Sequence, residues 1–287
     1  MSSEYSNQPE QVQKIKLTKN FVSKHIPTRE KQSYKGDYGK ILCIGGSVKM
    51  AGAITLSAKA ALYSGAGLVT VATHPENFSV VHSACLEIMC TDYTDFDELK
   101  SHIEQSDTIL IGPGLGRSRF SKDLFEMILH SVSDEQNFIM DADGLYFLSQ
   151  MNYNDVSLPA KTILTPHLGE WERLTGITPS KQTESKNKSC QHKLGATIVL
   201  KSHQTIVYSD EFIYQNTVGN PGMAVGGMGD TLAGMIAGLV KQCEFPITGV
   251  ASAVYLHSYI GDLLYKDQYV ALPSQIIEQI PTIMNQF

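Results

Sequence analysis

Short apolar runs alternate with longer, helix-like segments along most of the chain. Continuous apolar runs are typical of parallel strands that are buried on both faces of a sheet. Strands that alternate with helices predict an α/β fold. We therefore expect a mostly parallel central sheet flanked by helices. The predicted strands cover residues 41–44, 68–73, 108–111, 138–140, 162–164 and 197–200, and helices are expected over 50–64 and 96–105.

The segment 205–216 departs from this rhythm. Two β-rich runs flank Ser209, Asp210 and Glu211, which predicts a hairpin with antiparallel pairing at one edge of the sheet. Beyond Gly229 the pattern is mostly helical, over 230–242, over 247–265 and after Pro273.

The N-terminal residues do not follow the rhythm either. Residues 1–14 are polar and should be frayed, and Pro27 interrupts the stretch that follows. The chain contains no internal repeat, low-complexity tract or obvious linker. We therefore expect a polar lead-in over 1–34 and a single domain over 35–287.

A glycine-rich stretch precedes the predicted helix 230–242. Gly222, Gly226, Gly227 and Gly229 fall within eight residues. Glycines let the backbone take positive φ and approach a ligand closely. A helix start has unpaired N–H groups and the positive end of the helix dipole, so the stretch predicts an anion-binding loop. The chain has no G-x-x-x-x-G-K-[ST] and no G-x-G-x-x-G, which disfavours a Walker-type ATPase and a dehydrogenase.

Asp230 lies where this loop meets the helix. An aspartate at a helix start often serves as the N-cap. A carboxylate beside a phosphate site can instead act as a general base toward a substrate hydroxyl. A plain cap does not need four neighbouring glycines, so we favour the general base.

Other glycines and acids follow predicted strands, where ligands bind in α/β sheets. Residues 112–116 contain three glycines, which clear room for a ligand. Asp141 and Asp143 follow the strand 138–140, where they could hold Mg²⁺ through water or cap the next helix.

Three further side chains follow the next two predicted strands. His167 is predicted to contact a substrate, and Glu170 to be a cap or a neighbour of a metal through water. Too few ligands lie nearby for a zinc site. Lys201 follows the strand 197–200, where it could reach a nucleotide phosphate or remain solvated.

Composition and charge limit the partners. Hydrophobic residues make up 42% and charged residues 18% of the 287 residues, an ordinary globular balance. The net charge of −6 gives no bulk attraction to nucleic acid or to an anionic membrane. No secretory signal and no apolar run of about 18 residues is found, so no membrane segment is expected. Five cysteines without a C-x-x-C pair suit buried thiols in a reducing compartment, so we expect a cytoplasmic protein.

Seven motifs together resemble one family. They are GDYGKILCIGGS (36–47), AGAITLSAKAALYSGAGLVTVAT (51–73), IGPGLG (111–116), MDADGL (140–145), LTPHLGEWERLTG (164–176), VLKSHQT (199–205) and NPGMAVGGMGDTLAGMIAGL (220–239). In order and number they resemble the stand-alone bacterial ADP-dependent NAD(P)H-hydrate dehydratases of the ribokinase-like superfamily. The chain departs from the common family pattern at Met50, Ser202 and Val225, and none of these removes a charge or a loop glycine from the anion site.

The resemblance implies a repair enzyme that restores NADH or NADPH from the S-epimer of its hydrate. Its co-substrate would be ADP, or ATP, with Mg²⁺. It also implies a homotetramer and a hydrate epimerase on a separate chain. By resemblance the hydrate contacts Ala53, Gly116, His167 and Asp230, and the adenine nucleotide contacts Lys201, Ser202, His203, Gln204, Thr205 and Gly229.

We hypothesise that the terminal phosphate of the nucleotide lies against the N–H groups of Gly226, Gly227, Met228 and Gly229. Asp230 would then accept the proton of the hydroxyl that attacks this phosphate. Two alternatives remain open. The same loop and acid would serve a ribokinase-like kinase that phosphorylates a vitamin-like hydroxyl, or the chain could be a nucleotide sensor without turnover.

Overall fold

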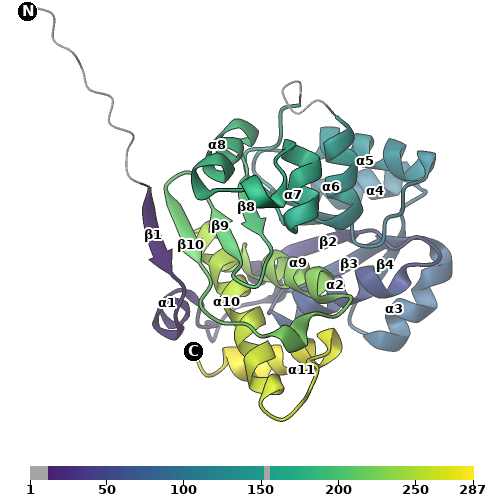
Figure 1. The fold of residues 1–287 in the computed structure, drawn as a ribbon. Helices are drawn as coiled ribbons and strands as arrows, with labels where there is room; N and C mark the ends of the chain where they lie inside the picture. The colour runs from purple at the N-terminus through teal and green to yellow at the C-terminus, as the bar shows by residue number, and fades with distance from the viewer. Residues whose placement is uncertain (1–11, 152–155) are drawn as a thin grey trace, which may run out of the picture.

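The computed structural model describes residues 12–151 and 156–287, so the predicted frayed start lies mostly outside the described residues. It contains a ten-stranded sheet in the order β1-β10-β9-β8-β7-β6-β5-β2-β3-β4 (Figure 1). The strands are β1 (Gln13–Lys16), β2 (Lys40–Ile44), β3 (Leu68–Thr73), β4 (Met89–Asp92), β5 (Thr108–Ile111), β6 (Asn137–Met140), β7 (Thr162–Leu164), β8 (Thr197–Leu200), β9 (Ile206–Tyr208) and β10 (Phe212–Gln215).

The prediction of a mostly parallel α/β sheet is confirmed. Strands β2 to β8 pair in parallel, whereas β9 pairs antiparallel with both β8 and β10. The hairpin predicted over 205–216 is therefore present near one edge of the sheet. The short strand β4 was not predicted, because its sequence MCTD has no apolar run.

Residues 13–25 differ from the predicted lead-in. Strand β1 pairs in parallel with β10 and forms the outer edge of the sheet, and helix α1 (Lys19–His25) follows it. Leu17 and Val22 are fully buried in the core. The prediction was wrong here because QKIK contains a single apolar residue, Ile15, which is too little pattern to indicate a strand.

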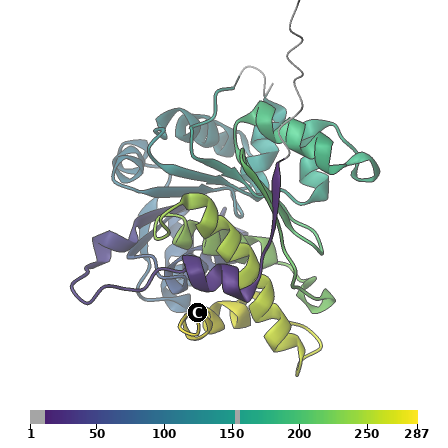
Figure 2. The same cartoon turned by 90° about the vertical axis from the view of Figure 1, so that its left-hand side faces the viewer.

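Helices cover both faces of the sheet (Figure 2). Successive strand residues point to opposite faces. Ile41 and Cys43 of β2 belong to one apolar cluster, and Leu42 and Ile44 belong to the other. One face carries α1, α2 (Ala51–Tyr63), α3 (Phe78–Ala84), α9 (Met228–Leu239), α10 (Pro246–Tyr265) and α11 (Pro273–Met284). The other carries α4 (Phe96–Glu104), α5 (Arg119–Ser131), α6 (Ala142–Gln150), α7 (Leu168–Thr175) and α8 (Glu184–Leu194). None of the helices in the described ranges combines the length and apolar character needed to cross a membrane.

Helices α2 and α9 pack unusually closely, which fixes the start of α9. A Cβ atom at Gly234 would lie 2.0 Å from the backbone oxygen of Ser57, so only glycine fits at this position. One turn earlier on α9, the Ser57 hydroxyl donates a hydrogen bond of 2.9 Å to the backbone oxygen of Asp230. The small residues of α9 therefore allow the contact that positions Asp230.

We predict that Gly234→Ala lowers the free energy of unfolding by about 1–3 kcal/mol, because the added methyl group forces the two helices apart. Gly52→Ala on the exposed side of α2 is the matched control, since a Cβ there meets nothing within 4 Å. The control should raise stability by roughly 0.5–1 kcal/mol through helix propensity. Denaturant unfolding measures both, and equal changes in the two variants would contradict this account of the packing.

Candidate active site

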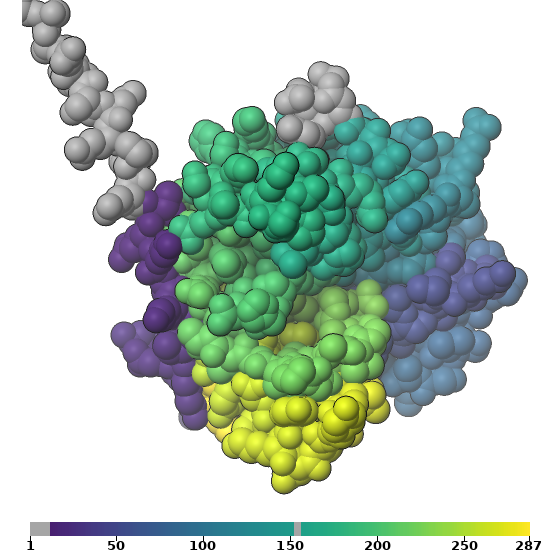
Figure 3. All heavy atoms as spheres, in the orientation of Figure 1, coloured from purple at the N-terminus to yellow at the C-terminus, as the bar shows by residue number. Residues whose placement is uncertain are grey.

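The loops after the parallel strands β7 and β8 meet at one edge of the sheet. There they border a cavity of about 780 Å³ together with the residues before and at the start of α9 and part of α10. The surface of the molecule has a hollow among the green segments, near the centre of the face that Figure 3 shows. The cavity is lined by His167, by residues 201–205 and 217–221, by Met223, Ala224, Met228 and Gly229 of the glycine-rich stretch, and by Leu232, Val254, His257 and Ser258.

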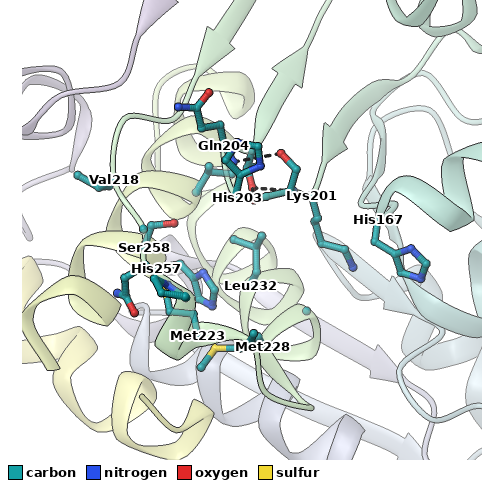
Figure 4. Close-up of a pocket in the computed structure, with 18 of the residues that line it drawn as sticks. His167, Lys201, His203, Gln204, Val218, Met223, Met228, Leu232, His257 and Ser258 are labelled. Atoms are coloured by element: carbon teal, nitrogen blue, oxygen red, sulfur yellow. Dashed lines mark hydrogen bonds between the residues drawn. The ribbon is translucent and has the colours of Figure 1, made fainter. Parts of the chain in front are cut away.

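All six residues predicted to contact the nucleotide lie in this cavity wall. Residues 201–205 follow β8, and Gly229 lies in the first turn of α9. Figure 4 shows Lys201, His203 and Gln204 on one side of the cavity and Leu232 and His257 across from them. The structure thus brings residues 201–205 together with Gly229, which comes 24 residues after Thr205 in the sequence. Their contact with a nucleotide stays a prediction.

The start of α9 tests one of the two roles considered for Asp230, that of the N-cap. The N-cap residue is Gly227, with φ of +93°, a left-handed conformation that glycine adopts readily. Asp230 is the third residue of the helix, so the N-cap alternative is wrong. Its carboxylate accepts no hydrogen bond from the described part of the chain. The side chain therefore remains free to bind a proton or a ligand.

A compact charged cluster lies beside this helix start. Lys201 Nζ lies 2.7 Å from Asp141 Oδ1 and 3.9 Å from Glu170 Oε2. The Asp141 side chain is only 2% exposed, and Thr165 Oγ1 donates a hydrogen bond of 2.8 Å to it. A Cβ atom at Gly229 would lie 3.0 Å from Lys201 Nζ, so the ammonium group borders the first turn of α9.

Burial and like charges raise the pKa of Asp230 and Glu170, two acids beside Lys201. Burial raises the pKa of Asp230 from 3.8 to about 6, the Asp141 charge adds to the rise, and Lys201 opposes it. Burial likewise raises the pKa of Glu170. For Lys201, burial lowers the pKa, but the charges of Asp141 and Glu170 outweigh it and the net shift is upward. Asp230 is thus a carboxylate whose proton affinity suits general base catalysis near neutral pH.

The two aspartates of the MDADGL motif point apart. Ala142 between them has φ of +48°, a conformation that is costly for a residue with a Cβ atom. Asp141 faces Lys201, whereas Asp143 accepts hydrogen bonds from the Gly116 N–H at 2.9 Å and from Arg117 Nε at 2.8 Å. The two acids therefore do not act as a pair. Asp141 occupies the N-cap position of α6, but its side chain makes no capping hydrogen bond. A role of either acid near Mg²⁺ stays a prediction.

His167 and Glu170 cap helix α7 reciprocally. The His167 backbone N–H donates a hydrogen bond of 2.8 Å to Glu170 Oε2, and His167 Nδ1 accepts from the Gly169 N–H at 3.0 Å. The predicted cap at Glu170 is therefore present. Since Nδ1 is used as an acceptor, the His167 Nε2 atom carries the proton in the neutral ring. That nitrogen lies 3.6 Å from Glu170 Oε1, at the end of the cavity where Figure 4 places Lys201.

Ala53 and Gly116 do not line this cavity and belong to an adjoining corner of the site. A Cβ atom at Gly114 would lie 3.2 Å from Ala53 Cβ, which places the 112–116 loop on the first turn of α2. Ser57 Oγ lies 3.3 Å from the Ala53 carbonyl oxygen and 2.9 Å from that of Asp230. Ala53 is therefore one helical turn from the residue that holds Asp230. Their contact with a substrate stays a prediction.

Magnesium ions in proteins take oxygen ligands and usually keep several waters, bound by one or two carboxylates and by substrate phosphates. Asp141 and Glu170 supply carboxylate oxygens beside the helix start, which fits that chemistry. No cluster of three or more metal-ligating side chains occurs within residues 12–151 and 156–287. A magnesium ion held mainly by phosphates and water, with these two acids as neighbours, agrees with both observations.

Some residues of the site were missed from the sequence. Asp262 of α10 accepts hydrogen bonds from the Gly219 N–H at 3.0 Å and from Asn220 Nδ2 at 2.7 Å, which fixes the loop that forms one cavity wall. Thr165 and Ser57 orient Asp141 and Asp230. Single polar residues inside helices or next to strands give no pattern, so only the tertiary contacts reveal these roles.

Comparison with known proteins agrees with this architecture. The family model described as NAD(P)H-hydrate dehydratase matches residues 41–282. An ADP-dependent (S)-NAD(P)H-hydrate dehydratase from Staphylococcus aureus is 47% identical over 91% of this chain and 94% of its own length.

Two solved structures share the fold. A ribokinase-like superfamily protein from Enterococcus faecalis has a TM-score of 0.93 and 42% identity, and the match covers 95% of this chain and 96% of that chain. The ADP/ATP-dependent NAD(P)H-hydrate dehydratase from Bacillus subtilis, co-crystallised with ATP and Mg²⁺, has a TM-score of 0.82 and 29% identity, with 94% and 96% covered. These matches confirm the predicted ribokinase-like fold, and the chain belongs to the NAD(P)H-hydrate dehydratase family.

Proposed function

We propose that this protein dehydrates the S-epimer of hydrated NADH or NADPH, using ADP as co-substrate and forming AMP and phosphate. The observation that carries the proposal is the acid at the start of α9. Burial raises the pKa of Asp230 to about 6, and its carboxylate has no hydrogen-bond partner within the described chain. Asp230 itself is not in the cavity wall, but it lies beside Lys201 and directly follows Met228 and Gly229, which line a cavity large enough for a nucleotide. Membership of the dehydratase family supports the choice of substrate.

In the first step, the terminal phosphate of ADP lies against the backbone N–H groups of residues 226–229. Asp230 accepts the proton of the ring hydroxyl, and the hydroxyl oxygen forms a bond to the terminal phosphorus as the bond to AMP breaks. In the second step, the lone pair of the ring nitrogen expels the phosphorylated oxygen as phosphate. Loss of a proton from the neighbouring ring carbon then restores the double bond of the reduced nicotinamide.

The chemical purpose of the first step is to improve the leaving group, because hydroxide leaves far less readily than phosphate. Lys201 and the positive end of α9 stabilise the charge on the phosphates. When bound, Mg²⁺ would supply further charge neutralisation, and Asp141 and Glu170 would hold it through water. These two acids also keep Lys201 in place for the phosphates.

The proposal extends to the setting of the enzyme. We infer a homotetramer in the cytoplasm that acts together with a hydrate epimerase on a separate chain. ATP would serve as an alternative co-substrate. Light scattering coupled to size-exclusion chromatography tests the assembly, and a mass that corresponds to one chain would contradict it.

The direct test is a spectrophotometric assay with hydrated NADH, run in parallel with ADP and ATP. A dehydratase restores the absorbance of the reduced nicotinamide and releases one phosphate per turnover. A kinase acting on another hydroxyl would leave the hydrate unchanged and would accumulate a phosphoester from its own substrate. Absence of nicotinamide recovery with both nucleotides would refute the proposed function.

We predict that Asp230→Asn lowers kcat by about 10²–10⁴-fold, because the amide cannot accept the hydroxyl proton. The variant should fold normally, since its carboxylate makes no hydrogen bond within the described chain. Asp123→Asn on the exposed face of α5 is a control that removes the same charge far from the cavity. Steady-state kinetics measure both, and near-native turnover of the Asp230 variant would exclude its role as the base.

The pH dependence of kcat should follow the ionisation of Asp230. Only the carboxylate form accepts a proton, so kcat should fall below about pH 6 and approach a tenfold loss per pH unit. Above pH 7 this group should impose no further change. A kcat that stays constant from pH 7 to pH 5 in buffers that preserve the fold would contradict the assignment.

The same raised pKa predicts that Asp230 destabilises the fold at neutral pH. The folded state binds this proton more tightly than the unfolded state, whose pKa is near 3.8. The stability that protonation provides is complete below about pH 4 and is lost as the pH rises through about 6. Asp230→Asn should therefore raise the free energy of unfolding at pH 8 by about 1–3 kcal/mol. Urea unfolding at pH 8 and pH 4.5 measures this, and an equal effect at both pH values would contradict it.

A further inference from the structure

His257 is a polar residue of the cavity wall to which neither the sequence motifs nor the proposed chemistry assigns a role. It lies on α10 and is only 6% exposed, yet its ring borders the cavity. Figure 4 shows it beside Met223 and across the cavity from His203. Its neighbours in the wall, Leu232 and Val254, are apolar.

The imidazole ring of His257 is incompletely bonded. Its Nε2 atom is buried and has no hydrogen-bond partner within the described chain. Buried polar atoms in proteins are nearly always bonded, because an unsatisfied one costs roughly the full desolvation of the group. Nε2 is closed to solvent while the ring borders the cavity, so a small rotation of the ring brings this atom to a bound ligand, which is a natural source of the missing partner.

The ring is also uncharged at neutral pH. Burial and, after it, the charge of Lys201 lower the pKa of His257 to about 4, and a contact with the Met228 backbone offsets only part of this. A neutral imidazole has one donor and one acceptor nitrogen. It therefore suits the hydroxyl groups of a sugar or the edge of a base, and it brings no positive charge to a phosphate.

The cavity wall changes from charged to apolar, and His257 lies where the two parts meet. Lys201 and the first turn of α9 form the charged part, which suits phosphates. The His257 ring contacts the Met228 backbone in that first turn, and Met223, Leu232 and Val254 are apolar residues of the same wall. A nucleotide whose phosphates occupy the charged part begins its nucleoside part beside His257.

We propose that His257 hydrogen-bonds the nucleoside part of the nucleotide bound in this cavity. The inference rests on the proposed function for the presence of an adenine nucleotide, and on the geometry for the role of the residue. His257 is in this view a binding residue that selects and orients the nucleotide, and it takes no part in the transfer of the phosphoryl group.

The test is calorimetric titration of His257→Leu and His257→Gln with ADP, with adenosine and with inorganic pyrophosphate. Leucine fills the space without a polar atom, so ADP and adenosine should each bind about tenfold more weakly. Glutamine keeps a neutral hydrogen-bonding group and should recover most of the affinity. Pyrophosphate, which lacks the nucleoside, should bind wild type and both variants equally.

Three further measurements test whether the variants remain folded and whether the loss of affinity is specific to this histidine. His257→Leu should melt at or above the temperature of the wild type, because it removes an unpaired buried polar atom. His257→Met is a second apolar variant with the same expected loss of affinity. His130→Leu is the matched control, since His130 is an exposed helical histidine on α5 whose Nδ1 contacts the Glu126 carbonyl oxygen at 2.6 Å.

The outcomes separate this inference from the proposed function. Unchanged ADP affinity in the folded leucine and methionine variants overturns the inference, and so does an equal loss for pyrophosphate. A wild-type protein that binds ADP but does not restore the nicotinamide refutes the dehydratase function alone. In that case the selective loss of ADP and adenosine binding still supports the role of His257.

Discussion

The buried ion pair between Lys201 and Asp141 is the contact around which the site is organised. Its atoms lie 2.7 Å apart, and the Asp141 side chain is almost completely buried. Removing either partner would leave an uncompensated charge in the interior, which is costly. Glu170 from α7 and Asp230 from α9 act on the same ammonium group. Lys201, which directly follows β8, thus connects its own segment with those of Asp141, Glu170 and Asp230, which lie far apart in the sequence.

This charge balance also explains the state of Asp230. The cluster holds three acids and one lysine. Asp230 is the acid with the fewest hydrogen bonds, and its pKa is raised. Asp141 is held by Thr165 and Lys201, and Glu170 by the backbone of His167. Asp230 has no such support and is left as a base with a pKa of about 6. The acid that we propose as the general base is thus the one with the least hydrogen-bond support from the described chain.

The close packing of α2 on α9 connects the core to this site. Glycines and alanines on α9 let the backbone of α2 approach, and Ser57 then reaches the carbonyl of Asp230. On the other side, α10 contributes Asp262 to the loop before α9 and His257 to the cavity wall. Helix α9 is therefore supported by two neighbouring helices, α2 and α10.

The sequence by itself determined the alternation of strands and helices, the antiparallel hairpin, the glycine-rich helix start and, through its motifs, the family. These are local or periodic features, which can be recognised from the order of residues alone. Strands that are buried on both faces of the sheet, for example, appear as continuous apolar runs. It could not determine the edge strand β1, the opposite directions of Asp141 and Asp143, or the roles of Ser57, Asp262 and His257. Those depend on which segments meet, and on one strained residue, Ala142, whose conformation the surrounding packing imposes. That Asp230 is not the cap, and that its pKa is raised, was likewise decided only when the fold placed Gly227 at the cap and buried the acid near Asp141 and Lys201, because proton affinity is set by neighbours in space.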